Sequence, residues 1–228
     1  MKQVIPVLAI FLGSITVKGQ PVFNKTLKAE LDSIFIEDQL YRELLPLVFT
    51  DRGRDSLALV YKLPADSIRN YLFKKLYIAD SLNMQRVVQI IDQYGYPGKK
   101  LVGSPTNEAA YFIIQHSTKI AIYLPLIKKA AKEKELSFSL YAMMLDRSLM
   151  YNNKEQVYGT QGKGFEAINS VTGNKEWKMI IWPIKKPATV NKRRKKAGFP
   201  NTAEENAKML GINYEVLTLE DVKKMQAH

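Results

Sequence analysis

The sequence predicts a single-domain, mostly α-helical bundle with one β-hairpin near the C-terminal third. Apolar residues recur at helical spacing over long stretches, as Leu27, Leu31 and Ile34 do near the N-terminus. Glycine and proline residues separate these stretches, most clearly at 94–105. Only at about 164–184 do two runs of β-forming residues flank a short turn. We therefore expect helices on both sides of that hairpin.

Two long helical regions are expected in the N-terminal half. The first covers 24–49 as one amphipathic helix, and a charged, irregular stretch follows at 51–56. The second covers 64–94, either unbroken or interrupted near Asp80. Gly95 is expected to end it, because glycine readily adopts the left-handed conformation that closes helices.

Shorter helices are expected in the middle of the chain. The first, at 108–117, is capped by Thr106 or Asn107. It continues or bends through 119–136, where Pro125 predicts that a new helix starts, because the proline ring clashes with the preceding helical turn.

The remaining helices flank the hairpin. A methionine-rich helix opens at Ser137, and its methionines are expected to fill gaps in the core. The C-terminal helices occupy about 187–227 and comprise one that starts at Pro187 and two short capped helices. Thr218 and Asp221 form a predicted capping box at the last of these.

Residues 1–20 differ from the rest of the chain. Lys2 precedes an uncharged run at 4–17 that is mostly apolar, and small or β-branched residues, Val17 and Gly19, stand where the run ends. This order predicts a signal peptide that is removed near Gln20 and leaves one domain at 21–228. The alternative, a retained membrane anchor, needs about 20 apolar residues, and the run is shorter than that. We therefore expect export, to the periplasm or the medium, without stable membrane insertion afterwards.

Composition narrows the possible ligands. The chain has no cysteine, which excludes a disulfide framework, a thiol nucleophile and a lipid-carrying cysteine. Its formal charge of +12 falls by two when Lys2 and Lys18 leave with the signal peptide. Outside the cytoplasm, a basic protein is expected to meet small or polymeric anionic ligands and not nucleic acid. The basic run at 192–196 is either a solvated helix face or an anion-binding patch.

Charged side chains interrupt the apolar stripes of three predicted helices. Seven residues advance an α-helix by ~700°, within ~20° of two full turns, so Asp38 is in line with Leu31. By the same spacing, His116 is in line with Ala109. Unpaired buried charges cost several kcal/mol, so such groups must meet one another or line a wet cleft. We predict a common polar site whose catalytic candidates are His116, Asp38 and Asp146 and whose ligand-binding candidates are Gln39, Arg42, Gln115, Arg147, Gln156, Tyr158 and Gln161.

The segment QVYGTQ at 156–161 leaves the helix that carries Asp146 after only a few residues. Gly159 allows the backbone to turn back with its amides exposed. Gln156, Tyr158 and Gln161 are therefore expected to cover the polar site.

One hydrolytic mechanism is open to these residues. His116 is the only histidine apart from His228, and histidine is the side chain that ordinarily changes charge near neutral pH. It could act as a general acid or base, oriented by Asp38 or Asp146, while arginine holds an anionic group. No cofactor is predicted, and no metal site is predicted because one histidine among separated aspartates does not form a ligand cluster.

Other functions remain open. The same residues suit an envelope protein that binds an anionic or amide-bearing ligand without turnover, or a structural core network in which His116 is simply satisfied. A scaffold would need an exposed apolar surface, for which Trp177 and Trp182 are the candidates, although both are more typical of a core. The oligomeric state does not follow from the sequence.

Four short elements resemble an uncharacterised bacterial family, domain of unknown function 6624. They are D-Q-x-x-R at 38–42, Q-H-S at 115–117, D-R at 146–147 and Q-x-Y-G-T-Q at 156–161. The resemblance extends over about 27–214, with extra residues around 50–66. It implies no established activity.

Overall fold

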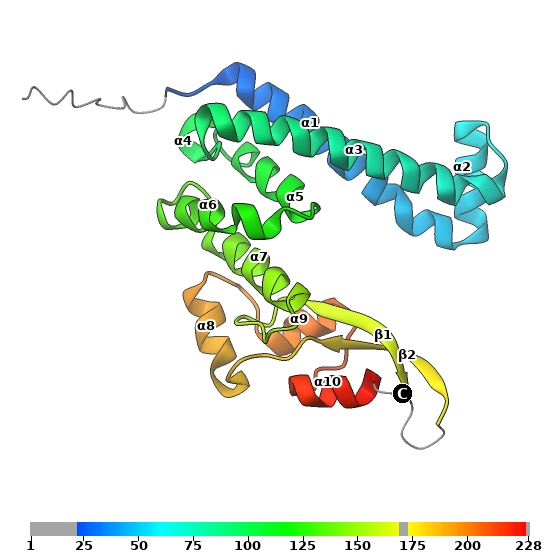
Figure 1. Cartoon of the computed structure of the whole chain (residues 1–228). Helices are drawn as coiled ribbons and strands as arrows, with labels where there is room; N and C mark the ends of the chain where they lie inside the picture. The colour runs from blue at the N-terminus through cyan, green and yellow to red at the C-terminus, as the bar shows by residue number, and fades with distance from the viewer. Residues whose placement is uncertain (1–21, 169–172, 227–228) are drawn as a thin grey trace, which may run out of the picture.

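A computed structural model describes residues 22–168 and 173–226 of the chain. Within them the protein is mostly helical with one antiparallel hairpin, which confirms the predicted fold class (Figure 1). The predicted signal peptide lies outside the described residues. The helices are α1 (Lys25–Leu44), α2 (Asp51–Tyr61), α3 (Ala65–Tyr94), α4 (Lys99–Val102), α5 (Ala109–Gln115), α6 (Ile120–Lys132), α7 (Phe138–Tyr151), α8 (Val190–Lys196), α9 (Ala203–Met209) and α10 (Leu219–Gln226), and the strands are β1 (Gly162–Ile168) and β2 (Lys175–Ile181).

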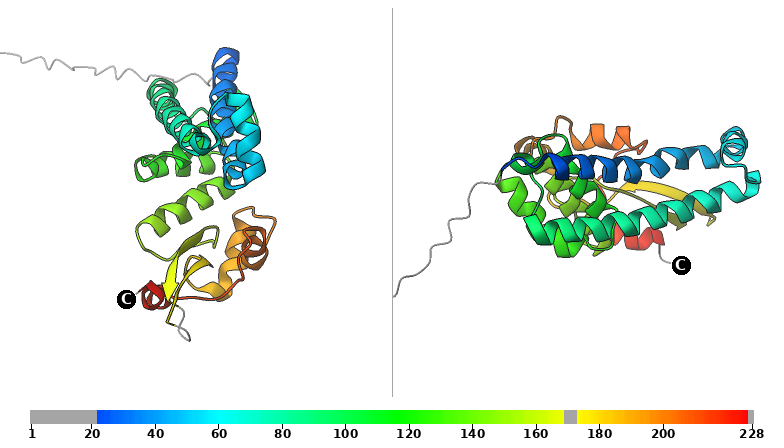
Figure 2. Two further views of the ribbon diagram at one scale, coloured as in Figure 1. Left: turned by 90° about the vertical axis from the view of Figure 1, so that its right-hand side faces the viewer. Right: turned by 90° about the horizontal axis from the view of Figure 1, so that it is seen from above.

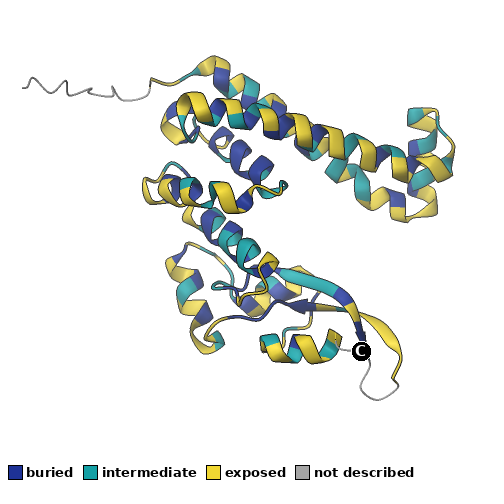
Figure 3. Cartoon of the chain, in the orientation of Figure 1, coloured by how far each residue is buried: buried dark blue, intermediate teal, exposed yellow. Residues whose placement is uncertain are grey.

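The elements form three layers. The long helices α1 and α3 run antiparallel in the first layer, α5, α6 and α7 form the second, and the hairpin with α8, α9 and α10 forms the third (Figures 1 and 2). The apolar stripe of α1, with Leu27, Leu31 and Ile34, is buried among residues of α3 and α5. The burial of each helix reflects its layer: much of the outer surface of α1 and α3 is exposed, whereas α5 is largely buried (Figure 3).

The predicted helix at 24–49 is too long. Helix α1 ends at Leu44, and a 3₁₀ segment, Leu45–Phe49, follows it. Pro46 accounts for the change, because it has no amide hydrogen to donate to the carbonyl four residues earlier and its ring crowds the preceding turn.

The stretch at 51–56, expected to be irregular, forms the first turns of α2. The Thr50 hydroxyl caps this helix by accepting a hydrogen bond from the Gly53 amide at 3.2 Å. Gly53 packs tightly, since a Cβ atom there would clash with the Leu47 carbonyl oxygen. Leu57 of α2 then joins a small core with Ile68 and others at the distal end of α1 and α3. Tertiary contacts thus create a helix that the charged local sequence did not predict.

Helix α3 is unbroken through Asp80, which is one of the two alternatives that the sequence left open. The break in the middle of the chain differs from the prediction. Pro125 lies inside α6, and the chain turns earlier, between α5 and α6. Ser117 stabilises that turn because its hydroxyl donates to the Ile114 carbonyl at 2.8 Å and accepts from the Lys119 amide at 3.1 Å.

The predicted caps of the helix at 108–117 are absent, because α5 begins without a side-chain cap. Thr106 instead donates its hydroxyl hydrogen to Asp32 at 2.6 Å. Asn107 donates from its side-chain amide to the Glu135 carbonyl at 2.8 Å. Both side chains therefore connect different parts of the N-terminal core.

The hairpin is packed on both faces. Gly162 pairs with Ile181 at its open end. Phe165 and Ile180 face a core that includes Val222 of α10, whereas Ile181 packs in a separate core with residues of α8 and α9.

The capping box predicted for the last helix is confirmed. The Asp221 amide donates to the Thr218 hydroxyl at 3.1 Å, and the Thr218 amide donates to the Asp221 carboxylate at 2.9 Å. Thr202 and Glu205 form a second capping box at α9.

Candidate ligand-binding site

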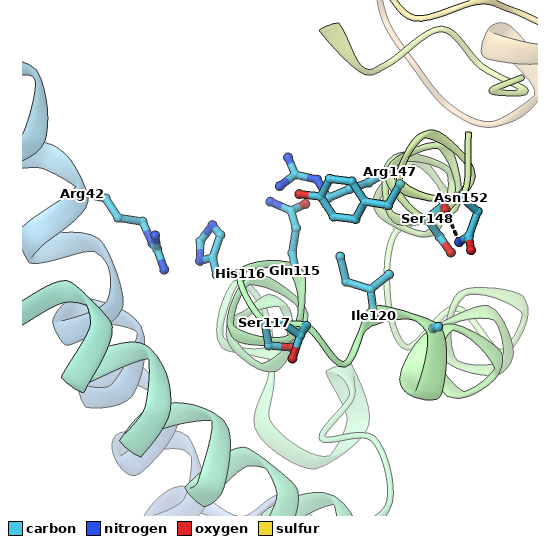
Figure 4. A pocket seen from close by; sticks show the side chains of 11 residues that line it. Arg42, Gln115, His116, Ser117, Ile120, Arg147, Ser148 and Asn152 are labelled. Atoms are coloured by element: carbon cyan, nitrogen blue, oxygen red, sulfur yellow. Dashed lines mark hydrogen bonds between the residues drawn. The ribbon is translucent and has the colours of Figure 1, made fainter. Parts of the chain in front are cut away.

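A cleft of about 610 Å³ lies where α1, α5, α6 and α7 approach one another. Its walls are Arg42 of α1, residues 115–118 and the start of α6, and the last two turns of α7 (Figure 4). Arginine, histidine, amide and hydroxyl groups line it, and none of the lining residues is acidic. Its volume lies within the usual range of small-molecule sites.

Four predicted site residues converge on one side of this cleft. Asp38 is fully buried, and its carboxylate lies 3.1 Å from Nδ1 of His116. The Gln39 amide donates to the same carboxylate at 2.6 Å, and Arg42 donates from Nη2 at 3.3 Å. The predicted convergence is therefore correct for Asp38, Gln39, Arg42 and His116.

The pKa of Asp38 reflects opposing effects. Burial raises the pKa, but hydrogen bonds from His116 and Arg42, together with their charges, bring it below its ordinary value. The Nδ1 contact with Asp38 leaves Nε2 of His116 without a partner among the described residues. Figure 4 places His116 between the guanidinium of Arg42 and the amide of Gln115.

Asp80 of α3 completes the network and was missed by the sequence analysis. Arg42 donates to Asp80 as well as to Asp38. Burial raises the pKa of Asp80, the Asp38 charge adds to this effect, and Arg42 opposes it. The seven-residue spacing could have found Asp80, because it is in line with the buried Val87.

Replacing Asp38 by Asn is expected to cost about 2 kcal/mol at pH 7, because His116 loses its ionised partner while Arg42 retains Asp80. A lowered folded-state pKa means that the Asp38 contribution is complete above the unfolded value of about 4 and disappears as pH falls through the folded value. Urea unfolding from pH 7 to pH 3 should show wild type and Asp38→Asn becoming closer in stability. A difference that grows on acidification would contradict this.

Arg147 is the second cation of the cleft and differs from Arg42. It lies on α7 and forms no hydrogen bond or ion pair within the residues that the structure describes. Its Nε atom is buried without a partner. Gln115 lies between Arg147 and His116 in Figure 4, and its side-chain carbonyl accepts a hydrogen bond from Tyr111 at 2.7 Å. The positive charge of Arg147 on this wall therefore has no counter-charge among the described residues and is available to a ligand.

Asp146 does not face the cleft, which corrects the prediction. Consecutive helical residues point about 100° apart, so Asp146 and Arg147 cannot both face His116. The Asp146 carboxylate accepts hydrogen bonds from the amides of Val157 at 2.7 Å, Tyr158 at 3.0 Å and Thr160 at 3.1 Å. The Thr160 hydroxyl adds a fourth donor at 3.0 Å. Burial raises the pKa of Asp146, and these bonds lower it by less.

Gln156, Tyr158 and Gln161 do not cover the cleft either. The fully buried Gln156 amide donates to the carbonyls of Trp182 at 2.6 Å and Gln161 at 3.0 Å. Its side-chain oxygen accepts from the Gln161 amide at 2.9 Å. The Gln161 side chain donates to the Thr160 hydroxyl at 3.0 Å. The Gln156 side chain thus satisfies main-chain groups of its own loop and of the hairpin end, and the Tyr158 ring centre lies 6.1 Å from that of Phe199.

The basic run at 192–196 contributes two arginines to the same loop. Arg194 is buried and donates to the Tyr158 carbonyl at 2.9 Å, while Arg193 donates to the Val157 carbonyl at 2.8 Å. Only the lysines of the run are exposed. The amides of this loop therefore donate to Asp146, and its carbonyls accept from the two arginines. Arg194 is thus neither part of a solvated helix face nor part of an anion-binding patch, the two predictions for the run.

A match to a family model shows to which protein family this chain belongs. The model of a family of unknown function (DUF6624) matches residues 40–218. The chain belongs to DUF6624. No similar protein was found among curated proteins, and no match was found among solved structures.

The DUF6624 match includes every residue that lines the cleft, Arg42, His116 and Arg147 among them, and begins two residues after Asp38. Among residues 22–168 and 173–226 of this DUF6624 chain, no three histidine or acidic side chains gather as metal ligands would. Over those same ranges no helix has the length and apolar character needed to cross a bilayer.

Proposed function

We propose that this DUF6624 chain is an exported protein that binds an anionic or amide-bearing ligand of the cell envelope in the cleft. The observation that carries the proposal is the unpartnered guanidinium of Arg147 on a cleft wall without acidic residues. Charged groups that are largely removed from water normally have a partner. An oxyanion would provide that partner, and guanidinium binds carboxylate or phosphate in a two-pronged geometry.

Export is supported by the basic start and apolar run of residues 1–20. N-terminal sequencing of the exported chain should give a start near Gln20 or Pro21. A chain that begins at Met1 would contradict the export proposal but leave ligand binding untouched.

Arg147→Met tests the binding proposal. Because Arg147 forms no hydrogen bond with any residue that the structure describes, the unliganded variant should unfold within about 1 kcal/mol of wild type. Acetate, phosphate and N-acetylglutamate should raise the melting temperature of wild type and not that of Arg147→Met. Arg52→Met, at an exposed site on α2, is the matched control and should respond like wild type.

Two outcomes would contradict the binding proposal. A loss of several kcal/mol in unliganded Arg147→Met would assign Arg147 to the fold, and an unchanged anion response would show that it does not hold the ligand.

Hydrolysis of the bound ligand is the second candidate function, and the Asp38–His116 contact favours it. With Nδ1 held by Asp38, Nε2 of His116 is free to take a proton from water at the ligand. His116→Gln should then retain the anion-dependent rise in melting temperature and lose turnover. If His116→Gln instead loses several kcal/mol of stability and the anion response persists, the structural-network alternative is correct for His116.

A further inference from the structure

Helix α7 presents two rows of polar side chains to the cleft. Arg147 and Tyr151 are four residues apart, as are Ser148 and Asn152, so each pair lies one above the other on the helix surface. One helical turn, about 5.4 Å, separates the members of each row. A ligand held by Arg147 therefore lies next to Tyr151.

Tyr151 is a bare aromatic ring at the edge of the cleft. It is 63% exposed, and within the described residues it forms no ring contact and no hydrogen bond. Tyr141, on the same helix, is buried and packs edge-on against Phe138. An exposed aromatic face beside a polar cleft can cover the flat apolar face of a ligand ring.

The side-chain amides of Asn152 and Gln115, which line the cleft with Tyr151, offer both hydrogen-bond donors and acceptors. The Asn152 amide nitrogen donates to the Ser148 carbonyl at 2.7 Å, which leaves the Asn152 side-chain oxygen as an acceptor. The Gln115 side-chain oxygen already accepts from Tyr111, which leaves its amide hydrogens as donors. This mixture suits a ligand with several hydroxyl groups, each of which both donates and accepts.

The charges of the cleft indicate which anionic group the ligand carries. Arg42 is shared between the carboxylates of Asp38 and Asp80, so Arg147 is the arginine of the cleft with its full charge unmatched. One unmatched positive charge balances a carboxylate, whereas a dianionic phosphate would retain negative charge among largely neutral groups.

We infer, resting on the proposed function, that the ligand is an acidic saccharide. Arg147 binds the carboxylate of a uronic-acid-type sugar, Tyr151 stacks on the sugar ring, and Gln115 and Asn152 bind its hydroxyl groups.

The test is an NMR titration of the protein with D-galacturonate, D-galactose and acetate, followed through residues of the cleft. Galacturonate should bind up to about tenfold more tightly than acetate, because it adds an aromatic contact to the same carboxylate. Tyr151→Ala should weaken galacturonate binding several-fold, toward the acetate level, and Tyr151→Phe should retain it. Tyr77→Ala, at a similarly exposed tyrosine on α3, should bind as wild type does.

The possible failures can be told apart. Equal binding of acetate and galacturonate, both dependent on Arg147, would overturn the saccharide inference and leave anion binding intact. Tighter binding of phosphate or of an acidic dipeptide than of galacturonate would likewise overturn it. No response to any anion would overturn the proposed function as well. Because Tyr151 is exposed, melting temperatures of its variants should match wild type and confirm that folding is unaffected.

Discussion

Replacing Asp146 by Asn is expected to destabilise the protein by about 3–5 kcal/mol. The carboxylate accepts from three backbone amides and one hydroxyl in a buried site. Asparagine has one acceptor oxygen, and its amide group would direct hydrogens toward the remaining donors. Two or more buried donors would then lack partners, and the loop at 156–161 would lose its attachment to α7.

Urea unfolding at pH 7 measures this effect. Asp92→Asn provides the control, because Asp92 is exposed on α3 and its replacement should change stability by no more than about 0.5 kcal/mol. A loss below about 1 kcal/mol for Asp146→Asn would mean that the loop keeps its conformation without the carboxylate.

Arg194→Met is expected to cost about 2–4 kcal/mol. The buried guanidinium donates to the Tyr158 carbonyl at 2.9 Å and to the Asn201 carbonyl at 2.9 Å, and its carbon lies 4.5 Å from the centre of the Phe199 ring. Methionine fills part of the volume but supplies no donors, so both carbonyls lose their charged partner.

The neighbouring lysine makes a matched control. Lys195→Met removes one charge from the same helix at an exposed position and should cost about 0.5 kcal/mol or less. Arg194→Lys should not restore stability, because a single ammonium group cannot reproduce the spread of guanidinium donors. Equal melting temperatures for Arg194→Met and Lys195→Met would show that the basic run acts only as a solvated face.

Periodicity predicted the parts of this protein in which side chains pack against side chains. The stripe through Leu27 and Leu31 predicted α1, and the same seven-residue spacing predicted that Asp38 and His116 would meet. Helix α2 was missed because Leu57 packs against Ile68 and Leu72 of α3, and the charged local sequence at 51–56 gives no sign of that packing.

Side chains that bind backbone were the ones placed wrongly. Asp146 and Arg194 bind main-chain amides and carbonyls. Nearly all residue types carry these groups, so the sequence does not indicate which of them will be the partners. Asp80 is different, because its partner is the Arg42 side chain and its spacing to Val87 matches the rule that identified Asp38.

The double attachment of the segment at 156–161 has a consequence for how variants of this family should be interpreted. The segment joins the hairpin to α7, and its two glutamine side chains hydrogen-bond main-chain groups of the loop, the hairpin end and α7. Substitutions in that segment should therefore lower the amount of folded protein in a cell. Changes at Arg147 or Tyr151 should leave that amount unchanged and alter only the binding of the ligand.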